Sequence, residues 1–205
     1  MLRNPVVLVH GFKDNAAKLE PLARFLRCDG WDARTVTLAP SWGQVGIEVL
    51  AKQLGDWIAD QFAPGQKIDL AGFSMGGLVC RFYLQRLGGL ARVQRFVTIS
   101  TPHNGTLMAR FWPGAGCRQM RSGSEFLRDL NGDAHLLASI QFTSLWTPFD
   151  LMILPARSSC LKVGTAQMLR VLAHPLMVWQ PSCLRAIATC LRQPLPDPLD
   201  PIARE

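Results

Sequence analysis

Several features that would assign a protein to a membrane, metal-binding or nucleic-acid-binding class are missing from this sequence. No run of about 18 uninterrupted apolar residues occurs, so we expect no membrane-spanning helix. The cysteines form no C-x-x-C pair and no zinc-binding spacing, which favours buried thiols over a disulfide framework. The formal net charge is +7, but the basic residues are scattered with no aromatic interleaving, so nucleic acid is not an expected partner.

The start of the chain has no secretory signal pattern. Met1 to Asn4 is short and runs directly into the apolar stretch Val6–Val9, which reads as a core strand. We therefore expect a cytoplasmic protein. The basic balance is compatible with peripheral contact with a lipid surface, the alternative being an ordinary solvated surface.

Strand and helix patterns alternate along the chain, which predicts an α/β fold with a mostly parallel, twisted sheet flanked by helices. Expected strands cover Val6–Val9, Ala33–Leu38, Lys67–Ala71, Val93–Ser100, Gln141–Trp146 and a stretch near Gln167–Leu172. Expected helices cover Ala16–Arg27, Val45–Phe62, Leu78–Leu84 and Gln180–Leu191. We interpret residues 1–205 as one domain, with a short cap-like insertion at 101–140 and a proline-rich tail at 193–205.

The pentapeptide Gly72-Phe73-Ser74-Met75-Gly76 follows an apolar strand pattern and precedes a helical one. This strand–turn–helix context is typical of a nucleophile elbow, in which a tight turn exposes a reactive serine. Glycines flank the serine because a Cβ at either position would collide with the neighbouring helix or strand. The helix N-terminus behind Ser74 also favours developing negative charge. Ser74 is therefore the candidate nucleophile.

An activated serine needs oxyanion donors, a base and an acid that orients the base. Gly11 allows the loop after the first strand to turn its amides towards the serine, so the backbone N–H groups of Phe12 and Met75 are the candidate donors. In sheets of this type the acid and then the histidine follow the nucleophile along the chain.

Two loops late in the sequence supply these partners. His174 follows the last strand pattern and is the candidate base, whereas His103 is interpreted as a structural histidine and His10 as support for the oxyanion loop. Asp150 follows the strand Gln141–Trp146 and is the candidate acid. The remaining histidine and two aspartates of the insertion, His135, Asp129 and Asp133, do not follow a strand.

The chain resembles the α/β-hydrolase superfamily, and within it the small bacterial triacylglycerol lipases and esterases. The matching segments are 7–12, 72–77, 100–106, 143–150 and 174–176. The resemblance implies the same roles for the five residues chosen above: Ser74, Asp150, His174, Phe12 and Met75. No carboxylate cluster suited to calcium is seen, so neither a metal nor another cofactor is expected.

The insertion carries apolar residues that could form an acyl pocket, namely Met108, Phe111, Trp112, Met120, Phe126 and Leu127. An apolar groove with few charges suits an acyl chain, so we expect a lipase or esterase acting on an acyl-ester or lipid substrate through an acyl-enzyme. The alternative for these residues is a small internal core. The alternative functions are an acyltransferase or thioesterase with the same triad, and a non-catalytic binding module of the same fold.

Overall fold

A computed structural model describes residues 3–195. Its centre is a six-stranded, fully parallel sheet with the strand order β2-β1-β3-β4-β5-β6. The strands are β1 (Val6–Val9), β2 (Ala33–Val36), β3 (Ile68–Phe73), β4 (Val93–Ile99), β5 (Gln141–Trp146) and β6 (Thr165–Met168). The predicted α/β fold with a mostly parallel sheet is thereby confirmed.

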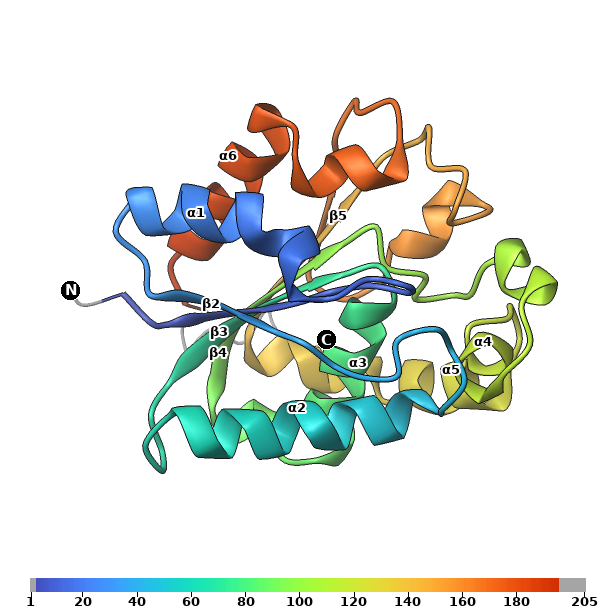
Figure 1. Cartoon of the computed structure of the whole chain (residues 1–205), viewed down its shortest axis with the longest axis horizontal. Helices are drawn as coiled ribbons and strands as arrows, with labels where there is room; N and C mark the ends of the chain where they lie inside the picture. Colours follow the sequence, from blue (N-terminus) through green and yellow to red (C-terminus); the bar gives the residue numbers. More distant parts are fainter. Residues whose placement is uncertain (1–2, 196–205) are drawn as a thin grey trace.

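Helices cover both faces of this sheet (Figure 1). The α-helices are α1 (Glu20–Cys28), α2 (Ile47–Gln61), α3 (Met75–Arg86), α4 (Ala115–Gln119), α5 (Glu125–Gly132) and α6 (Pro181–Arg192). The 3-10 helices are η1 (Ala16–Leu19), η2 (Gly89–Ala91), η3 (Leu107–Phe111), η4 (Ala134–Ser139), η5 (Ala156–Ser159) and η6 (His174–Val178). Among residues 3–195, no helix combines the length and apolar character needed to cross a bilayer.

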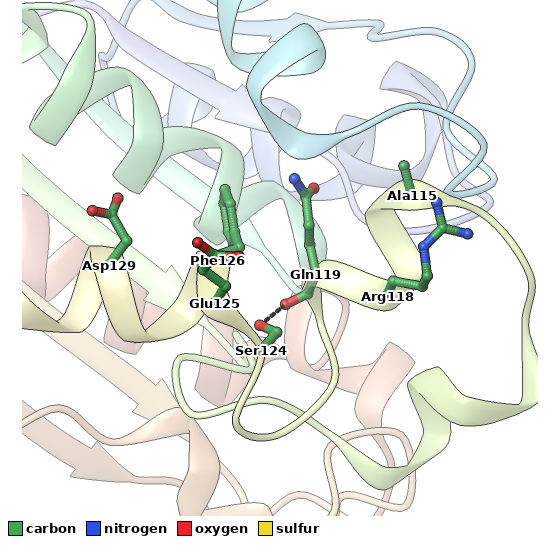
Figure 2. A pocket seen from close by; sticks show the side chains of 7 residues that line it. All are labelled: Ala115, Arg118, Gln119, Ser124, Glu125, Phe126 and Asp129. Atoms are coloured by element: carbon green, nitrogen blue, oxygen red, sulfur yellow. Dashed lines mark hydrogen bonds between the residues drawn. The ribbon is translucent and has the colours of Figure 1, made fainter.

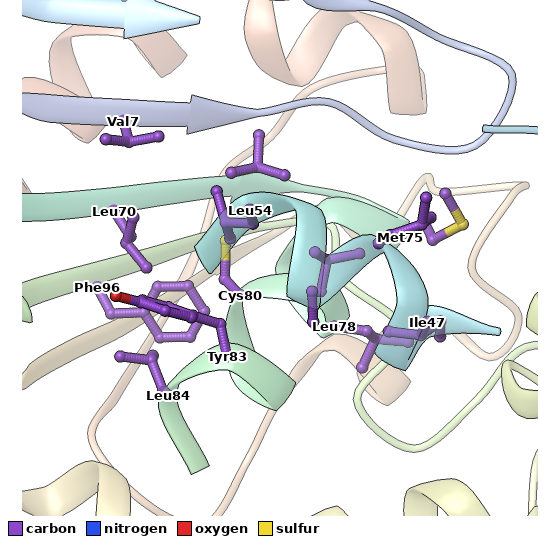
Figure 3. Close-up of a cluster of buried hydrophobic side chains, with 14 of the residues drawn as sticks. Val7, Ile47, Leu54, Leu70, Met75, Leu78, Cys80, Tyr83, Leu84 and Phe96 are labelled. Carbon is purple, nitrogen blue, oxygen red and sulfur yellow. The ribbon is translucent and has the colours of Figure 1, made fainter. Parts of the chain in front are cut away.

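Two hydrophobic cores form because side chains alternate between the two faces of each strand. Val7 and Leu70 pack on one face with α2 and α3, in the cluster drawn in Figure 3. Val6 and Leu8 point to the other face, where they pack with α1 and α6. Nearly every side chain of β1 and β3 is fully buried, as expected for central strands covered on both sides.

The strand order places the carboxyl ends of the central strands in position to bind a ligand. The chain passes from β1 to β2 on one side and then returns to β3 on the other side of β1. Ligands of open α/β sheets bind at the carboxyl ends of strands where the order reverses in this way. Phe12 follows β1 and Ser74 follows β3, so both lie at this switch point.

Most element boundaries agree with the sequence patterns to within a few residues, with two differences. The helix expected over Ala16–Arg27 is a 3-10 turn followed by α1, and Pro21 lies in the first turn of α1, where its missing N–H costs nothing. The strand expected near Gln167–Leu172 is β6, at Thr165–Met168, and all four of its residues are exposed. The expected tail at 193–205 lies outside the described residues from 196 onwards.

Candidate active site

Ser74 lies between β3 and α3 with a left-handed backbone, φ +53°. A non-glycine residue in this region is strained, as the nucleophile elbow requires. A Cβ added to Gly72 would lie 2.6 Å from the Cα of Gly77, and one added to Gly76 would lie 2.4 Å from the carbonyl oxygen of Val9. The two glycines of the pentapeptide therefore permit α3 to approach the strands closely enough to form the turn.

The loop after β1 lies directly against the serine. A Cβ on Gly11 would be 2.9 Å from the Cβ of Ser74, so only glycine fits here. Among the described residues, neither the backbone N–H of Phe12 nor that of Met75 has a hydrogen-bond acceptor. Met75 is the first residue of α3, where the N–H groups have no intrahelical partner.

His10 fixes the start of this loop. Its ring is buried, with Nδ1 3.0 Å from the carbonyl oxygen of Gly11 and Nε2 accepting the N–H of Leu38 at 3.0 Å. These partners assign the proton to Nδ1 in a neutral ring. Burial lowers the pKa of His10, although both hydrogen bonds oppose the shift. His10 therefore joins the ends of β1 and β2 and supports the loop, as the sequence predicts.

Asp150 and His174 meet although they are 24 residues apart in the sequence. The Nδ1 of His174 is 2.7 Å from Oδ2 of Asp150, and both side chains are buried. The other carboxylate oxygen accepts the backbone N–H groups of Met152 and Ile153, each at 2.9 Å. With Nδ1 donating to the carboxylate, the Nε2 of His174 is left to accept a proton.

Asp150 is an ionised carboxylate held in a buried site. Burial acts to raise its pKa, but the hydrogen bond and charge of His174 outweigh it, helped by the N–H of Ile153, and the pKa lies below its usual value. The hydroxyl of Ser100 contributes in the same direction, although its geometry falls short of a hydrogen bond. An ionised Asp150 stabilises the positive charge that the imidazole of His174 acquires when it takes up a proton.

His174 approaches the elbow through the residue before the serine. The ring centroids of Phe73 and His174 are 4.7 Å apart, and Phe73 ends β3. Among residues 3–195, the ring of His174 forms a hydrogen bond with Asp150 and none with Ser74. Catalytic hydrogen bonds are often long before substrate binds, so this arrangement is compatible with proton transfer from Ser74.

A small cavity opens beside Ser74. It has a volume of about 40 Å³ and is largely apolar. Its lining residues are Phe12, Ser74, Pro102, Thr106, Met108, Ala109, Trp112, Cys117, Met120, Met152 and Ile153. Three of these, Met108, Trp112 and Met120, were predicted from the sequence to form an acyl pocket.

The structure places the other three predicted pocket residues elsewhere. Phe111 is 74% exposed and does not line the cavity, while Phe126 stacks on Phe82 and Leu127 is buried in the core beside α2 and α3. Sequence analysis missed Met152 and Ile153. They lie two and three residues after Asp150, beyond the carboxyl end of β5, and this position is the signal that could have identified them.

A larger hollow of about 540 Å³ lies at α4 and α5, where Ser124 donates to the carbonyl oxygen of Gln119 at 2.6 Å (Figure 2). It is lined by Ala115, Arg118, Gln119, Ser124, Glu125, Phe126 and Asp129, a mixed polar set. None of the candidate catalytic residues lies there. The smaller cavity is therefore the one that adjoins the candidate catalytic residues.

The other histidines and aspartates considered in the sequence analysis do not line the cavity beside Ser74. His103 is fully buried, and its ring contacts two side chains, with Nε2 3.0 Å from the hydroxyl of Thr98 and Nδ1 3.5 Å from Arg81. Burial lowers the pKa of His103 well below its usual value, and the charge of Arg81 adds to this. Asp129 and Asp133 form salt bridges with Arg86 on the surface.

His135 is exposed in η4. No group of three or more potential metal ligands occurs within residues 3–195.

Comparison with known proteins agrees with this architecture. The sequence model of the palmitoyl protein thioesterase family matches residues 5–147, more than half of the chain. No curated protein matches. Among solved structures, lipase BlEst2 of Bacillus licheniformis in its mature form is similar at a TM-score of 0.77 and 16% identity, with 92% of each chain covered.

Two further structures extend this likeness. Lipase B of Aspergillus fumigatus matches with a TM-score of 0.78 and 18% identity, over 95% of this chain and 54% of that one. A thermophilic esterase of Thermogutta terrifontis matches with a TM-score of 0.65 and 19% identity, over 92% and 89%. At these identities the likeness establishes the α/β-hydrolase fold.

Proposed function

This chain belongs to the palmitoyl protein thioesterase family, and on that premise we propose that it cleaves acyl esters through Ser74, His174 and Asp150. As an α/β-hydrolase of the lipase, esterase and thioesterase kind, it is a hydrolase. The observation that carries the specific proposal is the 2.7 Å contact between buried Asp150 and His174, at the same sheet edge as the strained Ser74.

In the proposed reaction the Oγ of Ser74 attacks the acyl carbonyl while Nε2 of His174 takes the serine proton. Asp150 orients the imidazole and stabilises its positive charge. The negative charge on the carbonyl oxygen is stabilised by the N–H groups of Phe12 and Met75, each worth about 10²–10³ in rate. His174 then protonates the leaving group. In the second half of the reaction, His174 takes a proton from water, the water attacks the acyl carbonyl, and the proton passes to the Oγ of Ser74 as the acid is released.

Acyl thioesters are the second candidate substrate class, and the family match favours them. The same acyl-enzyme forms from an oxyester or a thioester, because only the leaving atom differs. The apolar cavity beside Ser74 suits the acyl part in either case.

We also propose that the surface around the site contacts an anionic lipid surface. Exposed apolar side chains gather on the loops at this sheet edge, including Phe111 and Leu151 at 74% and Leu172 at 77% exposure. The exposed Arg110 adjoins Phe111, and the exposed Arg170 is two residues from Leu172. Apolar side chains beside cationic ones are complementary to acyl chains beneath anionic head groups.

The test is hydrolysis of p-nitrophenyl butyrate, p-nitrophenyl palmitate and palmitoyl-coenzyme A by the wild type and by Ser74→Ala. We expect Ser74→Ala to lower kcat by roughly 10⁶ with every substrate that the wild type turns over. Faster turnover of palmitoyl-coenzyme A than of the oxyesters would identify a thioesterase. Undiminished turnover by Ser74→Ala would refute the proposed nucleophile.

A further inference from the structure

The ammonium group of Lys13 lies among three aromatic rings beside the cavity. Its Nζ is 3.2 Å from the ring centroid of Trp112, 4.7 Å from that of Trp42 and 5.5 Å from that of Phe12. All three distances are within the range at which a cation is attracted to the face of an aromatic ring. The rings of Phe12 and Trp112 are also in contact with each other, with centroids 5.8 Å apart.

The backbone holds Lys13 in this position at some cost. Lys13 has φ +61°, a left-handed conformation that a lysine seldom adopts. Its N–H donates to the carbonyl oxygen of Ser41 at 2.9 Å, which joins the loop after β1 to the loop that carries Trp42. Within residues 3–195, no carboxylate forms a salt bridge with Lys13. The aromatic rings are thus the main partners of this charge.

Trp112 belongs to a segment, Leu107–Trp112, which we call the flap. Bonds near both ends fix it: Leu107 N–H donates to Leu154 O at 3.0 Å, and Gly116 N–H beyond the flap donates to Gly43 O at 3.1 Å. In its middle, the contact from Arg121 to a flap carbonyl is long, at 3.4 Å. Ala109 packs in the hydrophobic core, and Trp112 is the cavity-lining residue of the flap that contacts Phe12 and Lys13.

The cavity beside the flap encloses too little space for a long acyl chain. A volume of about 40 Å³ accommodates roughly three water molecules, whereas ligand pockets usually have about 300–1,000 Å³. Phe12 and Trp112 both line the cavity. Widening it along this wall requires Trp112 to separate from Phe12 and so to leave Lys13.

We propose that Lys13 holds the flap closed through Trp112 and thereby makes the site selective for short acyl chains. This inference rests on the proposed function, because it assigns the selectivity of the same acyl site. A short acyl group is bound with the flap closed. Binding of a long chain requires the flap to open, which costs the free energy of the contact between the ammonium of Lys13 and the ring of Trp112.

The size of the expected effect follows from the strength of one cation–ring contact. Such a contact changes an equilibrium constant by roughly 2- to 30-fold. Lys13→Met keeps an unbranched side chain of similar length but has no charge, whereas Lys13→Arg keeps a cation that stacks on aromatic rings. The pair therefore separates the charge from the shape of the side chain.

The experiment compares kcat/KM for p-nitrophenyl palmitate with that for p-nitrophenyl butyrate in the wild type and both variants. We expect the palmitate-to-butyrate ratio to rise roughly 2- to 30-fold in Lys13→Met and to stay near the wild-type value in Lys13→Arg. A ratio that changes less than twofold in Lys13→Met, or equally in both variants, overturns the proposal.

Hydrogen exchange of the flap separates this proposal from the proposed function. Faster amide exchange over Leu107–Trp112 in Lys13→Met, and not in Lys13→Arg, is the expected result. If amide exchange over the flap is unchanged in Lys13→Met, Lys13 does not hold the flap, even if Ser74 proves to be the nucleophile. If the wild type hydrolyses neither ester, the proposed function fails, and exchange of the flap still decides whether Lys13 holds it.

Discussion

Replacing Asp150 by asparagine changes a single atom in the network that orients His174. In the wild type, one carboxylate oxygen accepts the N–H groups of Met152 and Ile153 at 2.9 Å, and the other accepts Nδ1 of His174 at 2.7 Å. The amide oxygen of asparagine can keep the first two bonds. Its NH₂ group would then face Nδ1 and donate to it, which moves the imidazole proton to Nε2.

A histidine protonated on Nε2 cannot accept the proton of Ser74. The equivalent change in serine protease triads lowers kcat about 10⁴-fold, which corresponds to about 5 kcal/mol of activation free energy. The effect on folding should be smaller. The variant keeps the packing and two hydrogen bonds, and it loses one charge-assisted bond worth about 1.5–3 kcal/mol.

The assay is kcat for p-nitrophenyl butyrate, with the free energy of unfolding measured by urea in parallel. Asp32→Asn is the matched control, because Asp32 is exposed, pairs with Arg34 and lies before β2 at the opposite edge of the sheet. We expect the control to retain the wild-type kcat. If Asp150→Asn stays within tenfold of the wild type, then another group orients His174 and the assignment of the acid is wrong.

Three other substitutions test separate parts of the account. Gly11→Ala adds a Cβ that would lie 2.9 Å from that of Ser74, so it should displace the oxyanion loop and lower kcat by about 10²–10³; kinetics near the wild type would contradict the placement of this loop. The pKa of His103 is below its unfolded value, so its contribution to stability is present above about pH 6.5 and is lost as pH falls. The urea-derived free energy of unfolding should accordingly fall with decreasing pH, and His103→Gln should reduce this slope by up to about 1.4 kcal/mol per pH unit; an equal slope in both proteins would refute it. Leu172→Ser should weaken sedimentation with phosphatidylglycerol vesicles several-fold, whereas Leu87→Ser, on the far end of α3, should not; equal effects would exclude the proposed lipid contact.

The parts of the site that sequence analysis predicts are those with a local cause. Gly72 is required by backbone contacts with Gly76 and Gly77 in the turn itself, and Gly76 by a close approach to the neighbouring strand β1, so the pentapeptide records how tightly the turn packs. Asp150 and His174 follow strand patterns, and parallel strands bring their carboxyl ends to one edge of the sheet. Their side-chain contact could therefore be expected without any knowledge of the loops between them.

The cavity walls were harder to predict because tertiary contacts decide them. The flap is a short 3-10 helix without the periodic pattern that would reveal its buried face, so Met108 could not be separated from Phe111 by sequence. Its position depends on close backbone contact with a distant loop, since a Cβ on Gly114 would lie 2.1 Å from the carbonyl oxygen of Gly43. Leu127 shows the same limit, because an amphipathic helix has a buried face whether that face meets a pocket or the core.

The most direct test of the central claim is labelling with a fluorophosphonate probe followed by peptide mapping. The account predicts one adduct, on Ser74, formed rapidly by the wild type and far more slowly by His174→Ala, because the imidazole activates the hydroxyl. An adduct on a different serine, or labelling of Ser74 at the same rate in both proteins, would contradict the proposed triad.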